Sequence, residues 1–461
     1  MINMLPDDAL LEIFDFYKDD PQNRIDFTWE WNTLTQVCRR WRYVVFGSPR
    51  RLDLQLVCTS TTPTKRLLDI WPPFPIILSV PPPFPAVDKN GMENIIAALK
   101  RRDRISKVDM YQIDGPVLKE LVAVLHEPLP VLEHFSLMST DESAPVLPET
   151  FLGGFAPRLR SFVLRGIPFP SFPKFNLCFP HIVLLHLEEI PSSGYISPEV
   201  MVTCLAALPS LEWLSIGFRS PPSLPLRSSP PRLARAALPS LTYLRFSGVS
   251  EYFEEFIARI DIPRLARISL AFFMDLIFEI PRLRNFIDRK EVPKPFSQAV
   301  MKFSGRTIGI ILERSRWFGL EIRCERPDWQ LSSMTQIFNE QLPLLSHVEQ
   351  LEFLEFTGGE NLEWKDDPDM DSSQWLELFR LFVAAQSLHV SKILVSPVAR
   401  ALQDLTGQMT MEVLPALRTL SLEGLEPSGP VHEAMDSFAT ARQLSHQPVV
   451  IQRWERQGPL S

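Results

Sequence analysis

Residues Leu208–Ile216 read LPSLEWLSI, and residues Leu238–Phe246 repeat this segment almost unchanged as LPSLTYLRF. Six further segments fit the same pattern: LPVLEHFSL from Leu129, APRLRSFVL from Ala156, FPHIVLLHL from Phe179, IPRLARISL from Ile262, LPALRTLSL from Leu414 and, without the proline, LSHVEQLEF from Leu345. Each copy contains L-x-x-L-x-L, in which alternate apolar residues enter a core and the residues between them face outward, as in a β-strand. The repeated pattern therefore predicts a stack of short strands.

The spacing of these copies indicates the class of repeat. The first six prolines, from Pro130 to Pro263, are 27, 23, 29, 30 and 24 residues apart, close to the period of about 20 to 29 residues of leucine-rich repeats, which the segments resemble. The Asn or Cys expected after the last leucine is missing from every copy, so we expect irregular repeats. The intervals beyond Pro263 are longer, and WFGLEIRC (from Trp317) and SLHVSKILV (from Ser387) are candidate hidden strands.

Composition narrows the class of protein further. The chain has 461 residues, a formal net charge of −8, and 43 prolines against 18 glycines. An acidic chain without a basic stripe is not expected to bind nucleic acid. Five scattered cysteines, an odd number, are typical of a reducing compartment. With neither a signal-like N-terminus nor a long apolar run, the expectation is a soluble protein of the cytoplasm or nucleus that does not enter membranes.

The first fifty residues predict two amphipathic helices. The first lies in LPDDALLEIFDFY from Leu5, where Pro6 suits the first helical position and acidic residues follow in the first turn. The second lies in LTQVCRRWRYVVFG, from Leu34 to Gly47, where Thr33 is the expected N-cap. Periodicity places the apolar residues of the second segment on one face and its arginines on the other. By periodicity alone, this is an ordinary helical pair.

The same residues carry a resemblance to the F-box. Leu5-Pro6, the Ile13-Phe14 pair and Val37-Cys38-Arg39-x-Trp41 are similar to that motif in residue type, order and position. The F-box docks on the Skp-type adaptor of a cullin-RING (SCF-type) ubiquitin ligase. Carried over by position, the resemblance implies that the residues facing the adaptor, or supporting that face, are Leu5, Pro6, Leu10, Ile13, Phe14, Leu34, Val37, Cys38 and Trp41. The link between Phe14 and Leu34 is longer than in the usual motif.

Together, these patterns predict an α/β fold class, with a small N-terminal helical F-box, an irregular leucine-rich-repeat-like solenoid and a C-terminal helical cap. The expected boundaries are residues 1–55 for the F-box, 56–90 for a proline-rich connector, 91–425 for the degenerate repeats and 426–461 for the cap. The whole chain resembles the F-box/leucine-rich-repeat proteins that are numerous in mushroom-forming (basidiomycete) fungi.

Motifs for catalysis and cofactor binding were sought in the sequence. It contains no G-x-S-x-G, H-E-x-x-H, P-loop or G-x-G-x-x-G motif. Cys178, His181 and His186, with Cys204 further on, are the best metal candidates, but their spacing matches no common zinc site. We therefore expect neither an enzyme, nor a metal site, nor a cofactor.

A binding surface is expected on the concave strand face, where the residues between the leucines point. Exposed Trp, Tyr and Arg are enriched at binding hot spots. The candidate client-binding residues are Arg165, His186, Glu188, Trp213, Tyr243, Arg245 and Arg267. The alternative is that loops cover these side chains and they only pack. The leading functional hypothesis is a non-catalytic adaptor that brings an unknown client protein to the ligase; a repeat scaffold without a ubiquitination role is the alternative.

Overall fold

The computed structural model describes residues 5–18, 30–48, 54–80, 87–141, 144–148, 150–154, 156–168, 179–220, 235–273, 280–289, 296–313, 317–324, 327–341, 344–356, 372–403, 405 and 409–455. The chain divides into two compact units, the first formed by residues 1–196 with 203–213 and the second by residues 197–202 with 214–461. Helix α8 (Pro198–Leu205) is divided between these two residue sets.

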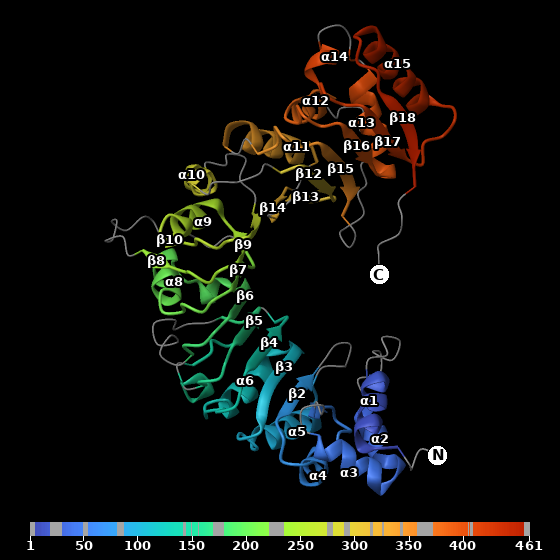
Figure 1. Ribbon diagram of the computed structural model, residues 1–461. Helices are drawn as coiled ribbons and strands as arrows, with labels where there is room; N and C mark the ends of the chain where they lie inside the picture. Colours follow the sequence, from blue (N-terminus) through green and yellow to red (C-terminus); the bar gives the residue numbers. More distant parts are fainter. Residues whose placement is uncertain are drawn as a thin grey trace. The chain divides into compact units, whose positions relative to one another are not determined.

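The first unit begins with three short helices, followed by a parallel sheet (Figure 1). The helices are α1 (Asp7–Lys18), α2 (Glu30–Val37) and α3 (Arg39–Gly47). The strands, in spatial and sequence order, are β1 (Leu54–Val57), β2 (Ile76–Val80), β3 (Ile105–Ile113), β4 (His134–Ser139), β5 (Ser161–Arg165) and β6 (Leu184–Ile190), all parallel. Between strands lie α4 (Thr64–Ile70), α5 (Lys89–Leu99), α6 (Gly115–Val124) and the 3₁₀ turns η4 (Phe151–Gly154) and η5 (Ser192–Gly194).

The second unit carries a sheet that is parallel except at one strand. Its order is β7 (Trp213–Phe218), β9 (Tyr243–Gly248), β11 (Arg267–Phe272), β14 (Trp317–Arg323), β13 (Thr307–Glu313), β12 (Gln298–Phe303), β15 (Gln350–Glu355), β16 (Ser387–Val390), β17 (Thr419–Glu423) and β18 (Val450–Trp454). Strand β13 runs antiparallel to both neighbours. A separate parallel pair joins β8 (Ala236–Ala237) to β10 (Ile260–Asp261).

Helices of the second unit follow many of its strands in sequence and pack beside them (Figure 1). They are α9 (Ser250–Ile257), α10 (Pro281–Arg289), α11 (Pro327–Gln336) with its π-helical end η6 (Ile337–Gln341), α12 (Ser372–Arg380), α13 (Lys392–Gln403), α14 (Met409–Glu412) and α15 (Pro430–Leu444). Phe303, Phe353 and Trp375, from β12, β15 and α12, stack in this core with ring centroids 5.6 to 5.8 Å apart.

The recurrent proline has a structural reason. Pro209 stands at the second position of a β-turn that the Leu211 N–H closes by donating to the Leu208 carbonyl, and proline favours that position because its φ is already fixed. The same turn, with both flanking apolar residues buried, recurs in other copies: Leu129–Leu132, Ala156–Leu159, Leu238–Leu241, Ile262–Leu265, Leu414–Leu417 and, without proline, Leu345–Val348. The predicted repeat pattern is confirmed as turn and strand.

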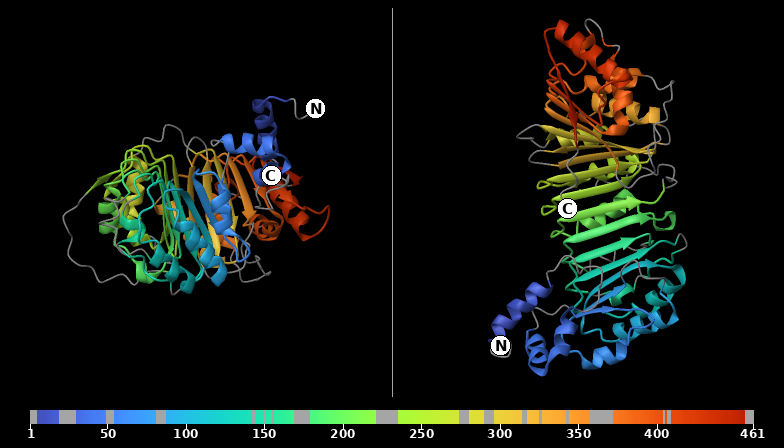
Figure 2. Two further views of the ribbon diagram at one scale, coloured as in Figure 1. Left: turned by 90° about the horizontal axis from the view of Figure 1, so that it is seen from below. Right: turned by 90° about the vertical axis from the view of Figure 1, so that its right-hand side faces the viewer.

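Successive strands stack side by side within each unit, as the right-hand view of Figure 2 shows. At several strand ends a backbone amide bonds to the neighbouring strand where an Asn side chain was missing: Phe273 N to Gly248 O at 3.0 Å, Ser391 N to Phe353 O at 2.9 Å and Phe356 N to Phe303 O at 2.8 Å. The architecture is mixed α/β with long parallel sheets, consistent with leucine-rich-repeat stacking. Both candidate hidden segments contain strands, β14 and β16, although the second continues into α13 from Lys392.

Three expectations differ from the structure. Residues 56–90 were expected to be a connector, but they include β2, whose register with β1 and β3 makes it part of the sheet. Residues 426–461 contain the expected helix, α15, and also β18, which pairs with β17. The helix expected from Thr33 to Gly47 is two helices, because Cys38 is extended (φ −158°, ψ 170°) and caps α3; Thr33 lies inside α2, which begins at Glu30.

Candidate functional site

The F-box-like residues of the first unit form a small core. Hydrogen bonds from Arg40 to Asp7 and Leu5, which we call the Arg40 clasp, hold two of its helices together. Leu10 and Phe14 of α1 are buried, and the ring of Trp41 on α3 lies 4.8 Å from the ring of Phe14. Cys38 Sγ accepts a hydrogen bond from the Trp41 N–H at 3.4 Å, which satisfies one of the unpaired donors at the start of α3. The break between α2 and α3 is therefore what points the Trp41 ring toward α1.

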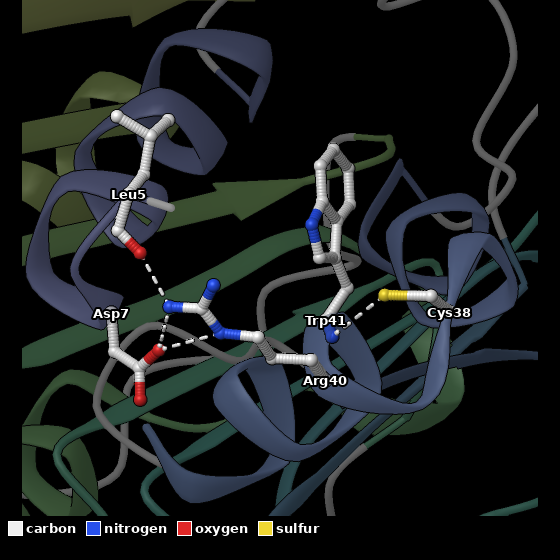
Figure 3. A network of polar contacts seen from close by, with 5 residues as sticks. All are labelled: Leu5, Asp7, Cys38, Arg40 and Trp41. Carbon is white, nitrogen blue, oxygen red and sulfur yellow. Dashed lines mark hydrogen bonds and ion pairs between the residues drawn. The ribbon is translucent and has the colours of Figure 1, made fainter. Parts of the chain in front are cut away.

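Arg40 ties α3 to the beginning of α1 (Figure 3). Its Nη2 donates to Asp7 Oδ1 at 2.8 Å and to the backbone carbonyl of Leu5, and its Nε donates to the same Asp7 oxygen at 3.2 Å. The sequence placed Arg40 on a solvated face, and the one signal for this contact was the acidic first turn of α1. This clasp fixes where Leu5 and Pro6 lie relative to α3.

Other members of the expected adaptor set are exposed. Ile13 is 47% exposed and Val37 is 58% exposed, while Pro6 is exposed and Leu5, Leu34, Cys38 and Trp41 are half-buried. Tyr43 of α3, 77% exposed, was missed by the sequence analysis because it stands among the arginines. Each of the three short helices therefore exposes one large apolar side chain, Ile13, Val37 or Tyr43. The predicted set thus divides into a core of Leu10 and Phe14 with Trp41 against it, a half-buried group and an exposed group, the last formed by Pro6, Ile13 and Val37.

The candidate client residues divide between the two units. In the first unit, Arg165 on β5 is in register with Glu188 on β6 and pairs with Glu189 at 2.5 Å, which raises the pKa of the guanidinium. His186 lies one row earlier, opposite Val163, and is half-buried. Trp213, at the start of β7, is 38% exposed and its N–H donates to the Val183 carbonyl. Of these side chains Arg165 and Trp213 are exposed, but the charge of Arg165 is already paired with Glu189.

The first unit also has a polar pair that the sequence analysis did not single out. His134 Nδ1 on β4 lies 2.8 Å from Ser161 Oγ on β5, one strand across. Burial lowers the pKa of His134, which favours the neutral ring. The sequence signal was their shared position in two copies of the repeat.

In the second unit, register brings together three residues, which we call the arginine–aromatic row: Tyr243 on β9, Arg267 on β11 and Trp317 on β14. Arg245, two residues after Tyr243, is opposite Ser269 and then Gly319 in the next row. Trp317 was outside the predicted set, because no repeat spacing relates it to Arg267. Its ring lies against Gly319, where an added Cβ would come within 2.7 Å of the ring.

The part of the chain that the structure describes defines no candidate metal site. Cys178 lies outside the described residues, and His181 is exposed. Where the structure describes the chain, no three His, Cys, Asp or Glu side chains are grouped to hold a metal ion. The described cysteines Cys38, Cys58, Cys204 and Cys324 are free thiols. None of the described helices combines the length and hydropathy needed to cross a bilayer.

Comparison with solved structures gives a distant likeness. The leucine-rich repeat-containing protein LegL7 from Legionella pneumophila is 12% identical, and the match covers 84% of this chain and 98% of that chain with a TM-score of 0.26. A TM-score this low carries no weight, so the repeat class is defined by the strand register and the repeated turns. No protein-family model matches the sequence, and the comparison with curated proteins gives no match.

Proposed function

We propose that the protein is a non-catalytic adaptor. Its three N-terminal helices bind a Skp-type adaptor of a cullin-RING ubiquitin ligase, and the strand face of its repeats binds a client protein. The observation that supports this most directly is the exposure of Ile13, Val37 and Tyr43 on helices that are otherwise held together by the Phe14–Trp41 contact and the Arg40 clasp. Within each unit the stacked repeats present a strand face, which suits protein binding.

The experiment is a binding measurement between the full chain and a purified Skp-type adaptor. The double variant Ile13→Asp, Val37→Asp places two charges on the exposed surface and is expected to abolish binding, because a desolvated unpaired carboxylate is strongly unfavourable. Both positions are exposed, so thermal stability should hardly change. The matched control is Ile70→Asp on α4, which is 59% exposed in the same unit. Equal adaptor binding by all three proteins would refute the proposed F-box role.

The alternative is a repeat scaffold without a ubiquitination role. It is favoured by the long segment between Phe14 and Leu34, which departs from the usual F-box spacing. Retention of client proteins in a pull-down from the native cell, without the adaptor and without ubiquitin transfer to those clients, would support the scaffold and exclude the ligase adaptor.

A further inference from the structure

We propose that the arginine–aromatic row, together with Arg245, binds an extended acidic segment of the client. Two carboxylate side chains, two residues apart in that segment, pair with Arg267 and Arg245. This inference rests on the proposed client-binding role of the strand face and specifies the chemistry of the partner. All the residues involved belong to the second unit.

The charge of the two arginines is available to a partner. Arg245 and Arg267 are both exposed, and neither guanidinium has a hydrogen bond or ion pair with another described residue. The first unit provides the contrast, since Arg165 on its strand face is paired with Glu189. In a chain with a net charge of −8, two unpaired guanidinium groups on neighbouring strands are a local reversal of charge. Such a patch complements carboxylates, which a guanidinium can bind through two parallel hydrogen bonds.

Spacing favours two separate carboxylates over a single anion. Arg267 and Arg245 stand on adjacent strands and are offset by two residues along the strand direction, since Arg267 is opposite Tyr243 and Arg245 is opposite Ser269. With strands about 4.8 Å apart and about 3.3 Å per residue, their Cα atoms are separated by roughly 8 Å. An extended segment places the side chains of residues i and i+2 on one side, about 7 Å apart. Each carboxylate can therefore meet its own guanidinium.

Aromatic residues lie on the strands next to Arg267. Tyr243 and Trp317 occupy the strands on either side of Arg267, in the same row. Rings on the two neighbouring strands offer a partner apolar contact area beside a positive charge, a combination typical of binding hot spots. Gly319 has no side chain beneath the Trp317 ring, which lets the ring lie close to the strand.

Acidic residues define where the acidic part of the client must end. Glu313 on β13 is opposite Trp317, and Glu321 follows Trp317 on β14. Beyond these carboxylates the row continues as Gln298 and Gln350, whose side chains are bonded to each other at 2.7 Å. Like charges repel, so a carboxylate of the client is favoured over Arg267 and Arg245 and disfavoured beyond Trp317.

The test uses the full chain and synthetic peptides labelled with fluorescein. The first peptide, Leu-Ala-Glu-Ala-Glu-Ala-Leu, has its two acids at i and i+2. Its isomer, Leu-Ala-Glu-Glu-Ala-Ala-Leu, has the same charge but directs the acids to opposite sides. A third carries phosphoserine in place of both acids. We expect fluorescence polarisation to show binding of the first peptide about tenfold tighter than of the isomer, and weakening with salt.

Protein variants locate the site. Arg267→Gln and Arg245→Gln should each weaken binding of the first peptide about tenfold, whereas Arg418→Gln, an exposed arginine elsewhere in the second unit, should leave it unchanged. Equal binding of the two isomers, tighter binding of the phosphoserine peptide, or indifference to both arginine variants would overturn the inference. Adaptor binding is measured on the same preparations: its retention when peptide binding fails would reject the acidic client and leave the ligase role standing.

Discussion

The ring of Trp41 on α3 packs against the ring of Phe14 on α1, with centroids 4.8 Å apart and planes inclined by 57°. This contact joins the two ends of the F-box-like motif. Trp41→Ala removes it and is expected to destabilise the three N-terminal helices by about 2 kcal/mol, below the ~3–5 kcal/mol for a fully buried ring because Trp41 is half-buried. Adaptor binding should be lost with it. Hydrogen exchange should show faster exchange in α1 to α3, and unchanged exchange there would contradict the packing described.

The Arg40 clasp predicts that one substitution can weaken adaptor binding while the stability of the protein stays nearly constant. Arg40→Lys keeps the charge but has one nitrogen, so it cannot reproduce the Nε and Nη2 bonds to Asp7 together with the Nη2 bond to the Leu5 carbonyl, and Leu5 and Pro6 lose their fixed position. Because the ion pair is largely exposed, the stability change should stay below about 1 kcal/mol. We expect weaker adaptor binding by calorimetry with a nearly constant melting temperature. A lysine variant that binds as tightly as the original would show that the clasp does not position the motif.

Arg442 of α15 is fully buried and donates to backbone carbonyls of the turn before β17. Nη1 bonds Thr410 O at 2.8 Å, and Nη2 bonds Leu414 O and Leu417 O, both at 3.2 Å. Arg442→Met keeps much of the volume but removes the guanidinium donor from the Thr410 and Leu417 carbonyls, at ~1–3 kcal/mol for each that stays buried, whereas the Leu414 carbonyl still accepts the Leu417 N–H. Chemical denaturation should reveal a loss of about 3 kcal/mol or more. Arg418→Met, at an exposed position, is the control and should change little.

Cysteine reactivity should follow burial. Burial raises the pKa of both Cys58 and Cys204 to about 12, and raises that of Cys324 as well. Because the thiolate is the reactive form, these three thiols should resist iodoacetamide at neutral pH until the protein unfolds. Of the four described cysteines, Cys38 is the half-buried one and should be alkylated before the other three. Mass spectrometry of the timed reaction would identify the sites, and early modification of Cys58 or Cys204 would contradict their burial.

Glu254 of α9 links stability to pH. Its carboxylate accepts the backbone N–H groups of Arg282 and Leu283 at the start of α10, yet burial dominates and raises its pKa above 4.5. The native state therefore binds more protons than the unfolded state between 4.5 and the raised pKa, so the free energy of unfolding falls as pH rises through that window. Glu254→Gln should flatten this dependence in denaturation curves measured from pH 4.5 upward. An unchanged slope would show that another group is responsible.

Sequence predicted the repeats because their signals are local. A proline turn and alternating leucines, as in Leu208–Ile216, determine turn and strand without reference to the rest of the chain. Strand β2 was missed because Pro75 and Pro81 adjoin it in sequence and suggested a connector, although neither lies inside the strand. The helix break at Cys38 was missed because a thiol is an unusual cap and apolar periodicity continues across it.

The functional surfaces could be predicted only in part. Spacing identified Tyr243 and Arg267 as neighbours, since both hold the same position in successive repeats. Trp317 belongs to the strands that interrupt the repeat, so its place beside Arg267 depends on tertiary pairing. Arg40 resembled a solvated residue of an amphipathic helix, and its pairing with Asp7 and the Leu5 carbonyl joins segments far apart in sequence. The partners of Arg442 are backbone carbonyls, which leave no trace in a sequence. Long-range contacts of this kind need coordinates.

The reversal of direction at β13 has a consequence for how the second unit forms. Only residues 304–306 separate β12 from β13, and only residues 314–316 separate β13 from β14. The parallel partners β9 and β11 must instead close a loop that contains α9. Short antiparallel connections lose the least chain entropy on closing and pair within microseconds. We therefore expect the strands that break the repeat to pair before the flanking parallel strands, an order that φ-value measurements on β12 to β14 would test.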